Sequence, residues 1–462
     1  MMIHDTLTGK LNEVNTQNIR IYLCGVTVYD ESHIGHARTI IIFDVLRRFL
    51  ENKGKKINFV QNFTDVDDKI INRATKEGVS ASEISEKYIQ NYFTDFDTLN
   101  IKRATVYPKA TEHIQDMLDL ISGLIEQKIA YVSKHGVYFA VSKFEEYGKL
   151  SKKKIDELQS GARIEIDEQK NNPLDFALWK FSDSEPTWSS PWGKGRPGWH
   201  IECSAMSLKY LGNSFEIHGG GRDLIFPHHE NEIAQSEAFT HKEFAKTWMH
   251  VGMVTINGEK MSKSLGNIKT IKHVLKNWGP NIIRLFCLSG HYSKPIDYSE
   301  DLLRENITKW RQVEAAYYEM IHSKSQGNSK DLERFVEDCK KSFDDALNDD
   351  MDTHLATAAF FRLVKEINRI AAEEELTKSI SGIFLLEFNR MLGILGLYIP
   401  EISDDEITKV NKMLEDREKF RKEKNYEQAD KIRDEISSRG IELIDHKSRT
   451  IWMKKERIKS DR

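Results

Sequence analysis

The chain has 462 residues, which is too long for one hydrophobic core and predicts about three domains. Its composition, with 39% hydrophobic residues, 30% charged residues and only 9 prolines, is that of a globular protein and excludes a fibrous or largely disordered chain. The net charge of −4 excludes no partner, because nucleic-acid binding depends on where the charge lies and not on its sum.

The sequence predicts no membrane anchor, secretion signal or disulfide framework. The nearest apolar run, Met391 to Ile399, is much shorter than the roughly 18 residues needed to cross a bilayer. Residues 1–10 lack the apolar stretch that follows the basic start of a signal peptide. The four cysteines are widely spaced, which favours a reducing, cytoplasmic setting.

Strands and helices alternate at the start of the chain. An apolar run predicts a buried strand at 19–25, helical periodicity follows over 36–52, and a second strand is predicted at 57–63 before another helix. This order is typical of a doubly wound, Rossmann-like α/β domain. Such sheets bind ligands at the carboxyl ends of their strands, and Cys24 and Thr64 lie there.

Changes of pattern divide the chain into five predicted parts. The α/β catalytic domain occupies 1–119 and resumes over 196–304, and a connective insertion with short strands separates its halves at 120–195. Helical periodicity over 305–403 predicts a helical bundle domain, and a charged segment leads into a small α+β module at 404–462.

Two short motifs carry features suited to ATP. His33-Ile34-Gly35-His36 follows the first strand and opens a helix, whose positive end attracts phosphate, while Gly35 lets an adenine ring approach the backbone. Lys260 to Ser264 (KMSKS) carries Lys260 and Lys263, two ammonium groups suited to a triphosphate. A chance helix start and a solvated basic loop are the alternatives. In this order the two motifs resemble the signatures of class I aminoacyl-tRNA synthetases, and no Walker or GxGxxG motif is present.

Cysteine, histidine and glutamate residues suggest a metal site. His228 and Glu232 are four residues apart, so they would share one face of a helix, and they form no HExxH motif. Cys24 ends the first strand and Cys203 lies in a later helical stretch. Spacing alone leaves open a metal site, or buried thiols and core histidines without a metal.

Six stretches closely resemble the cysteinyl-tRNA synthetases, in order and from about Leu7 to Trp452: CGVTVYD, SHIGHART, QNFTDVDDKII, GRPGWHIECSAMS, IHGGGRDLIFPHHENEIAQSE and GEKMSKSLGN. The resemblance implies a ligase that activates L-cysteine with ATP and transfers it to the terminal adenosine of the cysteine tRNA. It also implies one zinc ion per subunit, bound by the residues that match the family's ligands: Cys24, Cys203, His228 and Glu232.

The same resemblance assigns roles around ATP. His33 and His36 would stabilise charge on the phosphate, Lys260 and Lys263 would hold the pyrophosphate, and Mg²⁺ would accompany ATP. Adenosine would lie against three glycines, Gly219, Gly220 and Gly221, with Gly35 also close to it. Asp223 would bond the ribose, whereas a plain turn is the alternative for this segment.

Thr64 and Trp199 resemble positions that line the cysteine pocket, with an ordinary core residue as the alternative for Trp199. Zinc accepts a thiolate far better than a hydroxyl. Rejecting serine by four decades needs about 5.5 kcal/mol, which a lost metal bond supplies and a steric difference does not. A separate editing domain is then unnecessary, and the insertion at 120–195 is short for one.

The C-terminal module resembles the family's anticodon-binding segment. Trp452 would stack on a base. Arg421 and Asp430 could make polar contacts, but a solvated helix face is the favoured interpretation of both. Two features depart from the family pattern: Tyr426 replaces a usual tryptophan, and Arg449 to Met453 (RTIWM) replaces GTTWR.

Three rival functions are weighed against this one. A ligase of cysteine to an amino sugar would lack the C-terminal module, a non-catalytic tRNA-binding or zinc-sensing paralogue would not need both ATP motifs, and a bare nucleotidyltransferase would not need the thiol-bearing pocket. The family is commonly monomeric, and a monomer is expected here.

Overall fold

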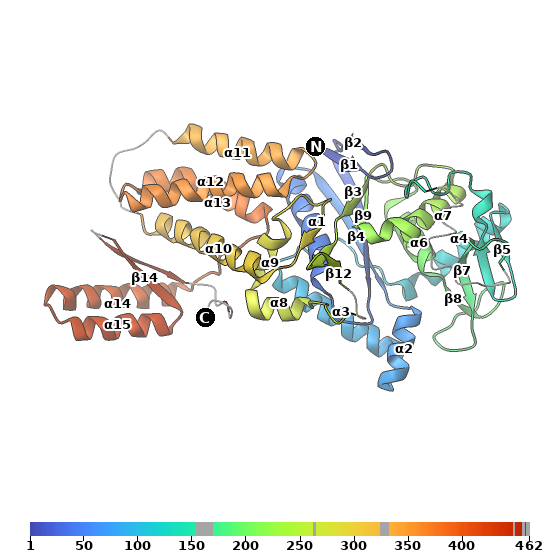
Figure 1. The fold of residues 1–462 in the computed structure, drawn as a ribbon, viewed down its shortest axis with the longest axis horizontal. Coiled ribbons are helices and arrows are strands. Elements are labelled where there is room, and N and C mark those ends of the chain that lie inside the picture. The colour runs from blue at the N-terminus through green and yellow to red at the C-terminus, as the bar shows by residue number, and fades with distance from the viewer. Residues whose placement is uncertain (154–169, 262–264, 324–331, 447–448, 455–457, 459–462) are drawn as a thin grey trace. The chain divides into compact units, whose positions relative to one another are not determined.

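The computed structural model describes residues 1–153, 170–261, 265–323, 332–446, 449–454 and 458. The chain divides into two compact units (Figure 1). The first unit contains residues 1–271 and two short later segments, Tyr292–Ile296 and Asp349–Met351. The second contains the remainder. Among the described residues, no helix combines the length and apolar character needed to cross a membrane.

A parallel sheet lies at the centre of the first unit. Its strand order is β10-β9-β3-β4, with β3 at Asn18–Thr27, β4 at Lys56–Thr64, β9 at Ile217–Gly221 and β10 at Trp248–Val251. Leu23 of β3 pairs with Gln61 of β4 on one side and with Gly219 of β9 on the other. Cys24 therefore lies close to the carboxyl ends of three neighbouring strands.

Helices connect these strands, as the α/β prediction requires. Helix α1 follows β3, contacts β4, β9 and β10, and buries the apolar residues Ile41, Phe43 and Leu46 completely. Among the described residues, the α-helices of this unit are α1 (Ile34–Asn52), α2 (Asp68–Glu77), α3 (Ala81–Thr98), α4 (Ile114–Glu126), α6 (Trp199–Leu211) and α7 (Glu230–Thr240). The doubly wound fold class is confirmed by the parallel sheet and its connecting helices.

Three antiparallel sheets complete the strands of the first unit. The predicted insertion contains a sheet of order β5-β6-β7-β8, formed by Ala130–Val132, Gly136–Phe139, Phe176–Phe181 and Gly195–Pro197. The others are the pair β1 (Met2–Asp5) and β2 (Lys10–Glu13) and the sheet β12 (Glu259–Lys260), β11 (Val254–Ile256) and β13 (Ile296–Asp297). The five-part division of the chain stays a prediction beside the two observed units.

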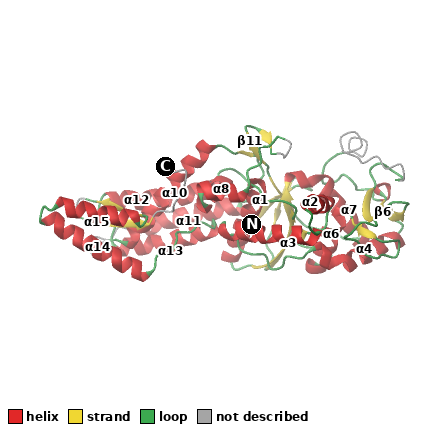
Figure 2. Ribbon diagram, turned by 90° about the horizontal axis from the view of Figure 1, so that it is seen from below, coloured by secondary structure: helices red, strands yellow, loops and turns green. Residues whose placement is uncertain are grey.

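The second unit is mainly helical, as Figure 2 shows by colour. Its core contains the fully buried Trp310, Phe343, Phe360 and Phe388. Its main helices before the C-terminal module are α9 (Pro280–Cys287), α10 (Glu300–Ile321), α11 (Glu333–Asn348), α12 (Thr353–Ala372) and α13 (Lys378–Ile394), and α8 (Ile271–Trp278) precedes them.

The C-terminal module pairs two helices with a hairpin: α14 (Asp404–Lys422), α15 (Tyr426–Ser438), β14 (Ile441–Asp445) and β15 (Thr450–Lys454). The prediction that Trp452 is free to stack on a base is wrong. Its side chain is only 3% exposed, packs against Tyr318 and His322, and donates its indole N–H to Asn411 at 2.9 Å. The ring is needed for this small core, which joins the hairpin to α10.

Two polar contacts strengthen the same junction. Glu319 of α10 accepts hydrogen bonds from His446 at 2.7 Å and from Arg449 at 2.8 Å, and its side chain is 5% exposed. Arg449 is one of the departures from the family pattern, and here its ion pair with Glu319 links the hairpin to α10. Removing one partner of such a buried pair leaves an uncompensated charge.

We expect His322 to make the junction sensitive to acid. Burial, with Arg449 nearby, lowers the pKa of His322 to about 4. Because the folded pKa lies below the unfolded value of about 6.5, stability is intact above pH 6.5 and falls as the pH drops towards 4. Protonation of His322 should lower the free energy of unfolding by roughly 1 to 2 kcal/mol at pH 5. Urea unfolding at pH 7 and pH 5 should show a smaller pH effect in His322→Gln than in wild type, and an equal effect in both proteins would refute the assignment.

Candidate active site

The predicted ATP histidines begin helix α1. His33 is the N-cap residue: its Nδ1 accepts from the backbone N–H of Gly35 at 3.2 Å, and Nδ1 of His36 accepts from the backbone N–H of His33 at 3.3 Å. The two rings stack with centroids 3.7 Å apart. Burial, and then the neighbouring His33, lowers the pKa of His36 well below its usual value. In a neutral imidazole whose Nδ1 accepts a hydrogen bond, the proton lies on Nε2.

Of the second ATP motif, the described Met261 lies beside the first. A Cβ added at Gly35 would lie 3.0 Å from the His33 ring and 3.3 Å from Cε of Met261. The backbone N–H of Ile34 donates to the carbonyl of Lys269 at 3.0 Å. Lys260 is exposed at the end of β12, and Lys263 lies outside the described residues. The structure thus brings Met261 of the second motif to the start of α1.

The three glycines form the end of strand β9 and not a turn. A Cβ at Gly219 would lie 1.9 Å from Phe43, and one at Gly220 would lie 2.9 Å from the ring of His229. A larger residue at Gly219 or Gly220 would therefore collide with Phe43 or His229. At Gly221 the close atom is Oδ1 of Asp223, at 2.5 Å, and Asp223 itself is exposed.

The four predicted metal ligands meet in the first unit. They come from β3, α6, the short irregular turn Ile225–His229, and α7. Sγ of Cys24 lies 3.8 Å from Sγ of Cys203 and 3.4 Å from Oε1 of Glu232, and Nε2 of His228 lies 3.0 Å from the same carboxylate oxygen. One donor atom of each lies within 4.8 Å of the others, and each side chain is at least nine-tenths buried.

The interpretation of His228 and Glu232 needs one correction. They do not share a regular helix, because α7 begins at Glu230 and His228 precedes it in the irregular turn. Their side chains nevertheless meet. The expectation that His228 and Glu232 lie close together is therefore confirmed, but not the expectation that a regular helix brings them together.

Two further histidines, which the sequence did not single out, support the cluster. Nε2 of His218 lies 2.8 Å from Oε2 of Glu232, and Nε2 of His229 lies 3.2 Å from Sγ of Cys24. With Cys24 and Glu232 they form a second set of possible metal donors. The other ring nitrogen of His229, Nδ1, lies 2.8 Å from Nε2 of His250. His229 could have been found from the sequence, because it directly follows the predicted ligand His228.

The electrostatics of the cluster suit a divalent cation. Burial raises the pKa of the Cys24 thiol, and burial, with nearby histidines, lowers the pKa of His228 and His229. The imidazoles are therefore neutral and able to ligate, while the thiols need a cation to become thiolates. Two thiols, one imidazole and one carboxylate are the donor set of a soft or borderline metal ion.

The predicted substrate residues lie next to the cluster. Trp199 is 38% exposed and stacks on His228 with ring centroids 4.2 Å apart, so it is not a core residue. Thr64, at the end of β4, donates its hydroxyl proton to Oε2 of Glu202 at 2.9 Å. The sequence had not singled out Glu202.

Comparisons with known proteins identify the family. A family model for class I (C) tRNA synthetase catalytic domains matches residues 10–308, and a DALR domain model matches residues 342–397. A cysteine–tRNA ligase of Thermodesulfovibrio yellowstonii is 48% identical over 98% of this chain and 99% of its own. That of Caldicellulosiruptor saccharolyticus is 47% identical over 99% of this chain and all of its own. The chain belongs to the cysteine–tRNA ligases.

It is accordingly a class I aminoacyl-tRNA synthetase that ligates cysteine to tRNA. Among solved structures, methionyl-tRNA synthetase of Mycobacterium tuberculosis with methionyl-adenylate has a TM-score of 0.61 and 14% identity, covering 82% of this chain and 90% of that one. LeuRS of Agrobacterium radiobacter K84 also has a TM-score of 0.61, with 9% identity, covering 82% and 84%. These two likenesses show a shared fold.

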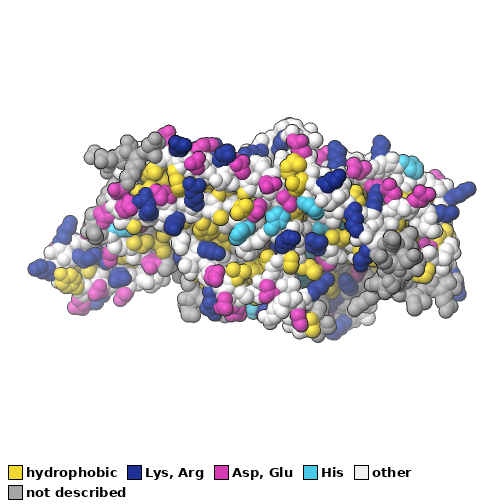
Figure 3. Space-filling view, turned by 45° about the horizontal axis from the view of Figure 1, so that its top comes forward, with side chains coloured by type: hydrophobic (Ala, Val, Ile, Leu, Met, Phe, Trp, Pro, Cys, Tyr) yellow, Lys and Arg dark blue, Asp and Glu magenta, His cyan; other side chains and the backbone are white. Residues whose placement is uncertain are grey.

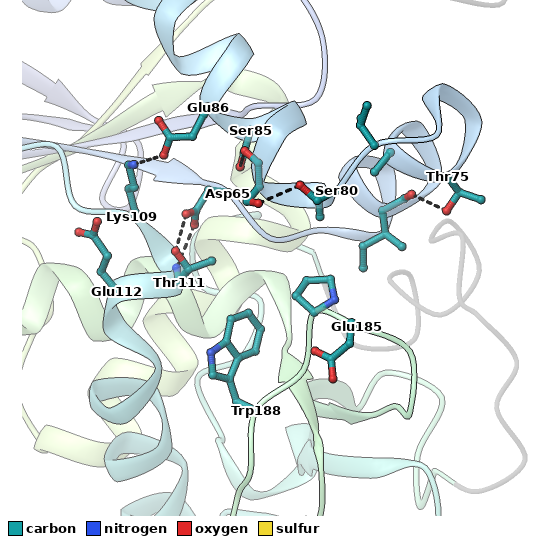
Figure 4. Close-up of a pocket in the computed structure, with 16 residues that line it drawn as sticks. Asp65, Thr75, Ser80, Ser85, Glu86, Lys109, Thr111, Glu112, Glu185 and Trp188 are labelled. Carbon is teal, nitrogen blue, oxygen red and sulfur yellow. Dashed lines mark hydrogen bonds and ion pairs between the residues drawn. The ribbon is translucent and has the colours of Figure 1, made fainter.

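A separate surface pocket of about 580 Å³ lies in the ligase's first unit (Figure 4). It is lined by residues of α2, α3 and the segment around Trp188, and Asp65 there accepts from the backbone and hydroxyl of Thr111. Lys109 is paired with Glu86. None of the predicted ATP, cysteine or metal residues lines it, so this pocket is not assigned to the reaction.

Two of the three predicted tRNA contacts, Arg421 and Asp430, are exposed. Arg421 has a side chain 47% exposed and lies 3.4 Å from Asp445, and Asp430 is exposed on α15. Basic and acidic side chains are intermixed on the face that Figure 3 shows, so charge alone does not identify a tRNA surface there.

Proposed function

We propose that this ligase selects L-cysteine through one zinc ion per subunit, held by the metal cluster: Cys24, Cys203, His228 and Glu232. The observation that carries the proposal is the convergence of these buried donors within 4.8 Å. When bound, zinc would accept the substrate sulfur and favour its thiolate, whose free pKa is about 8.5. The serine hydroxyl ionises far less readily and would lose this bond.

The residues around the cluster would orient the amino acid. Trp199, half-exposed and stacked on His228, offers an apolar ring at the entrance of the pocket. Thr64 offers a buried hydroxyl at the end of β4. A substrate held between these groups has its carboxylate free to attack the α-phosphate of ATP, which releases pyrophosphate.

The start of α1 would bind the phosphates of ATP. His33 and His36 would donate from Nε2 to phosphate oxygens as negative charge develops, aided by the positive helix end. Lys260 and Lys263 would hold the departing pyrophosphate, and Mg²⁺ would accompany ATP. Adenosine would lie near Gly35 and the end of β9, where the exposed Asp223 is suited to the ribose hydroxyls.

The tRNA for cysteine is the proposed acceptor, and the chain is proposed to act as a monomer in the cytoplasm, where translation takes place. The cysteine–tRNA ligases that match it extend over nearly the whole chain, including the C-terminal module, which an amino-sugar ligase would lack. Within that module, Arg421, Asp430 and the 61%-exposed Tyr426 are suited to contact tRNA, in place of the buried Trp452.

Substitution of the metal by Co²⁺ tests direct binding of the substrate sulfur. Thiolate ligands give cobalt an intense absorption, which is weak for hydroxyl ligands. We expect cobalt-loaded protein to show this band, and L-cysteine to increase it, because a further thiolate binds. L-serine at equal concentration should leave the spectrum unchanged. The same response to both amino acids, or none to cysteine, would contradict the proposal.

A further inference from the structure

Arg38 is a fully buried arginine of α1 to which the proposed reaction gives no role. It follows His36 by two residues, and its side chain is 0% exposed. A buried guanidinium group is costly unless its donors find acceptors. One of its nitrogens, Nη1, donates to the carbonyl of Gly252 at 2.9 Å and to that of Met253 at 3.1 Å. Both acceptors are backbone atoms, so Arg38 holds a segment of main chain against α1.

The held segment leads into the second ATP motif. Gly252 and Met253 connect β10 to β11, and β11 pairs with β12, which ends at Lys260. The carbonyl of Met253 also accepts from the backbone N–H of Ile296 at 3.1 Å. A Cβ added at Gly252 would lie 2.3 Å from the carbonyl oxygen of Lys294, so main chain packs directly on main chain there. The segment before the motif is therefore held from two sides.

The chain beyond the motif returns to the same end of α1. The backbone N–H of Ile34 donates to the carbonyl of Lys269 at 3.0 Å. Met261, which follows β12 directly, lies beside Gly35. The start of α1 thus holds the chain both before and after the KMSKS motif, and Arg38 makes the attachment that precedes it.

A guanidinium group suits this attachment better than an ammonium group does. Its donors point in fixed directions from a planar fork, whereas a lysine ends in a compact point charge. A hydrogen bond from a charged donor is roughly twice as strong as one between neutral groups. The two bonds of Arg38 therefore fix how β11 approaches α1, and with it where Lys260 begins the motif.

We propose that Arg38 is a positioning residue that sets the KMSKS lysines against the phosphate-binding start of α1. It acts through the hairpin of β11 and β12 and not by contact with a substrate. This inference rests on the proposed function, in which Lys260 and Lys263 hold the departing pyrophosphate. A change at Arg38 should then weaken only the step in which those lysines take part.

The test is Arg38→Lys in the full-length protein, because this variant keeps the positive charge but not the fork. Its kcat/KM for ATP in cysteine-dependent pyrophosphate exchange should fall by about 30-fold, the loss expected for hydrogen bonds from a charged group. The dissociation constant of adenosine, which has no phosphate, should stay within about threefold. The zinc content and the KM for cysteine should not change.

A double-mutant cycle separates this role from a merely structural one. With both lysines removed by Lys260→Ala and Lys263→Ala, Arg38→Lys should lower exchange by less than about threefold, because nothing remains to be positioned. A structural defect would instead lower exchange by the same factor in both backgrounds.

Arg48→Lys is the matched control. Arg48 lies on the same helix and also donates to a backbone carbonyl, that of Asn100 at 2.6 Å, in a segment outside both ATP motifs. Its exchange should stay within about twofold of wild type.

Met261→Ala carries the test should Arg38→Lys fail to fold. Met261 is only partly buried, and it attaches the other end of the same hairpin beside Gly35. Loss of this apolar contact should lower kcat/KM for ATP by at least about fivefold, with the zinc content unchanged.

An equal effect of Arg38→Lys with and without the two lysines would overturn the proposal, as would equal weakening of ATP and adenosine. An unchanged kcat/KM for ATP in folded Arg38→Lys, or in Met261→Ala where that variant replaces it, would overturn it too. Failure of the proposed function looks different. In that case the protein with Lys260→Ala and Lys263→Ala would itself exchange pyrophosphate at the wild-type rate.

Discussion

Cys203→Ser is expected to lose bound zinc and cysteine-dependent pyrophosphate exchange together. Serine offers a hard hydroxyl in place of the sulfur that lies 3.8 Å from Sγ of Cys24. Loss of a contact to a metal ligand lowers metal affinity by about 10- to 100-fold, and loss of a ligand itself costs more. We expect exchange to fall by at least about three orders of magnitude, because the substrate sulfur then has no metal to bind.

The measurement is metal analysis after dialysis against a weak chelator, alongside exchange at saturating ATP. Cys339→Ala is the matched control, because Cys339 is equally buried but lies in α11 of the second unit. It should keep both zinc and activity. A Cys203→Ser protein with full zinc content and full exchange would show that the metal assignment is wrong.

Removal of the residues from Asp404 onward is expected to separate the two half-reactions. The ATP motifs and the metal cluster belong to the first unit, whereas the C-terminal module belongs to the second. Adenylate formation should therefore remain within about threefold of wild type, since sites that share no residues or partners act almost independently. Charging of tRNA should fall by about two orders of magnitude through the loss of base stacking and polar contacts.

Tyr426→Ala tests the same division without removing a domain. The ring of Tyr426 is 61% exposed, so its loss should leave the fold intact. Loss of one stacked base costs about 1 to 3 kcal/mol, which predicts at least a fivefold rise in KM for tRNA and unchanged exchange. Trp452→Ala should instead destabilise the module, because that ring is buried. Equal loss of exchange and charging in the truncated chain would refute the division.

The features that could be predicted from the residues alone are those formed by residues close together in the sequence. The strands at 19–25 and 57–63 and the helix at 36–52 were evident from apolar periodicity, and the structure lengthens each by two or three residues. The helix start at His33 to His36 was likewise predicted from residues within one turn of chain. Such local patterns are visible in a single sequence.

The metal cluster required a different kind of inference. Cys24 and Cys203 are 179 residues apart and Cys24 and Glu232 are 208 apart, so periodicity could not bring them together. The resemblance to a family did so. The partnership of Thr64 with Glu202, 138 residues away, was missed because neither local pattern nor the resemblance indicated it.

Burial was the other source of error. Trp452 was interpreted as an exposed stacking ring, and its burial depends on α10 and α14, which are distant in sequence. The contact of Gly219 and Gly220 with adenosine stays a prediction, although Phe43 and His229 fill the space where their Cβ atoms would lie. For Trp452 the packing of another element decided the role of the residue.

Amino-acid-dependent ATP–pyrophosphate exchange, with cysteine and serine side by side before and after removal of zinc, tests the central claim most directly. We expect strong exchange with cysteine, at least about four decades less with serine, and loss of cysteine-dependent exchange on chelation that added zinc restores. Cysteine exchange that survives complete removal of the metal, or comparable exchange with serine, would contradict selection by a zinc-bound thiolate.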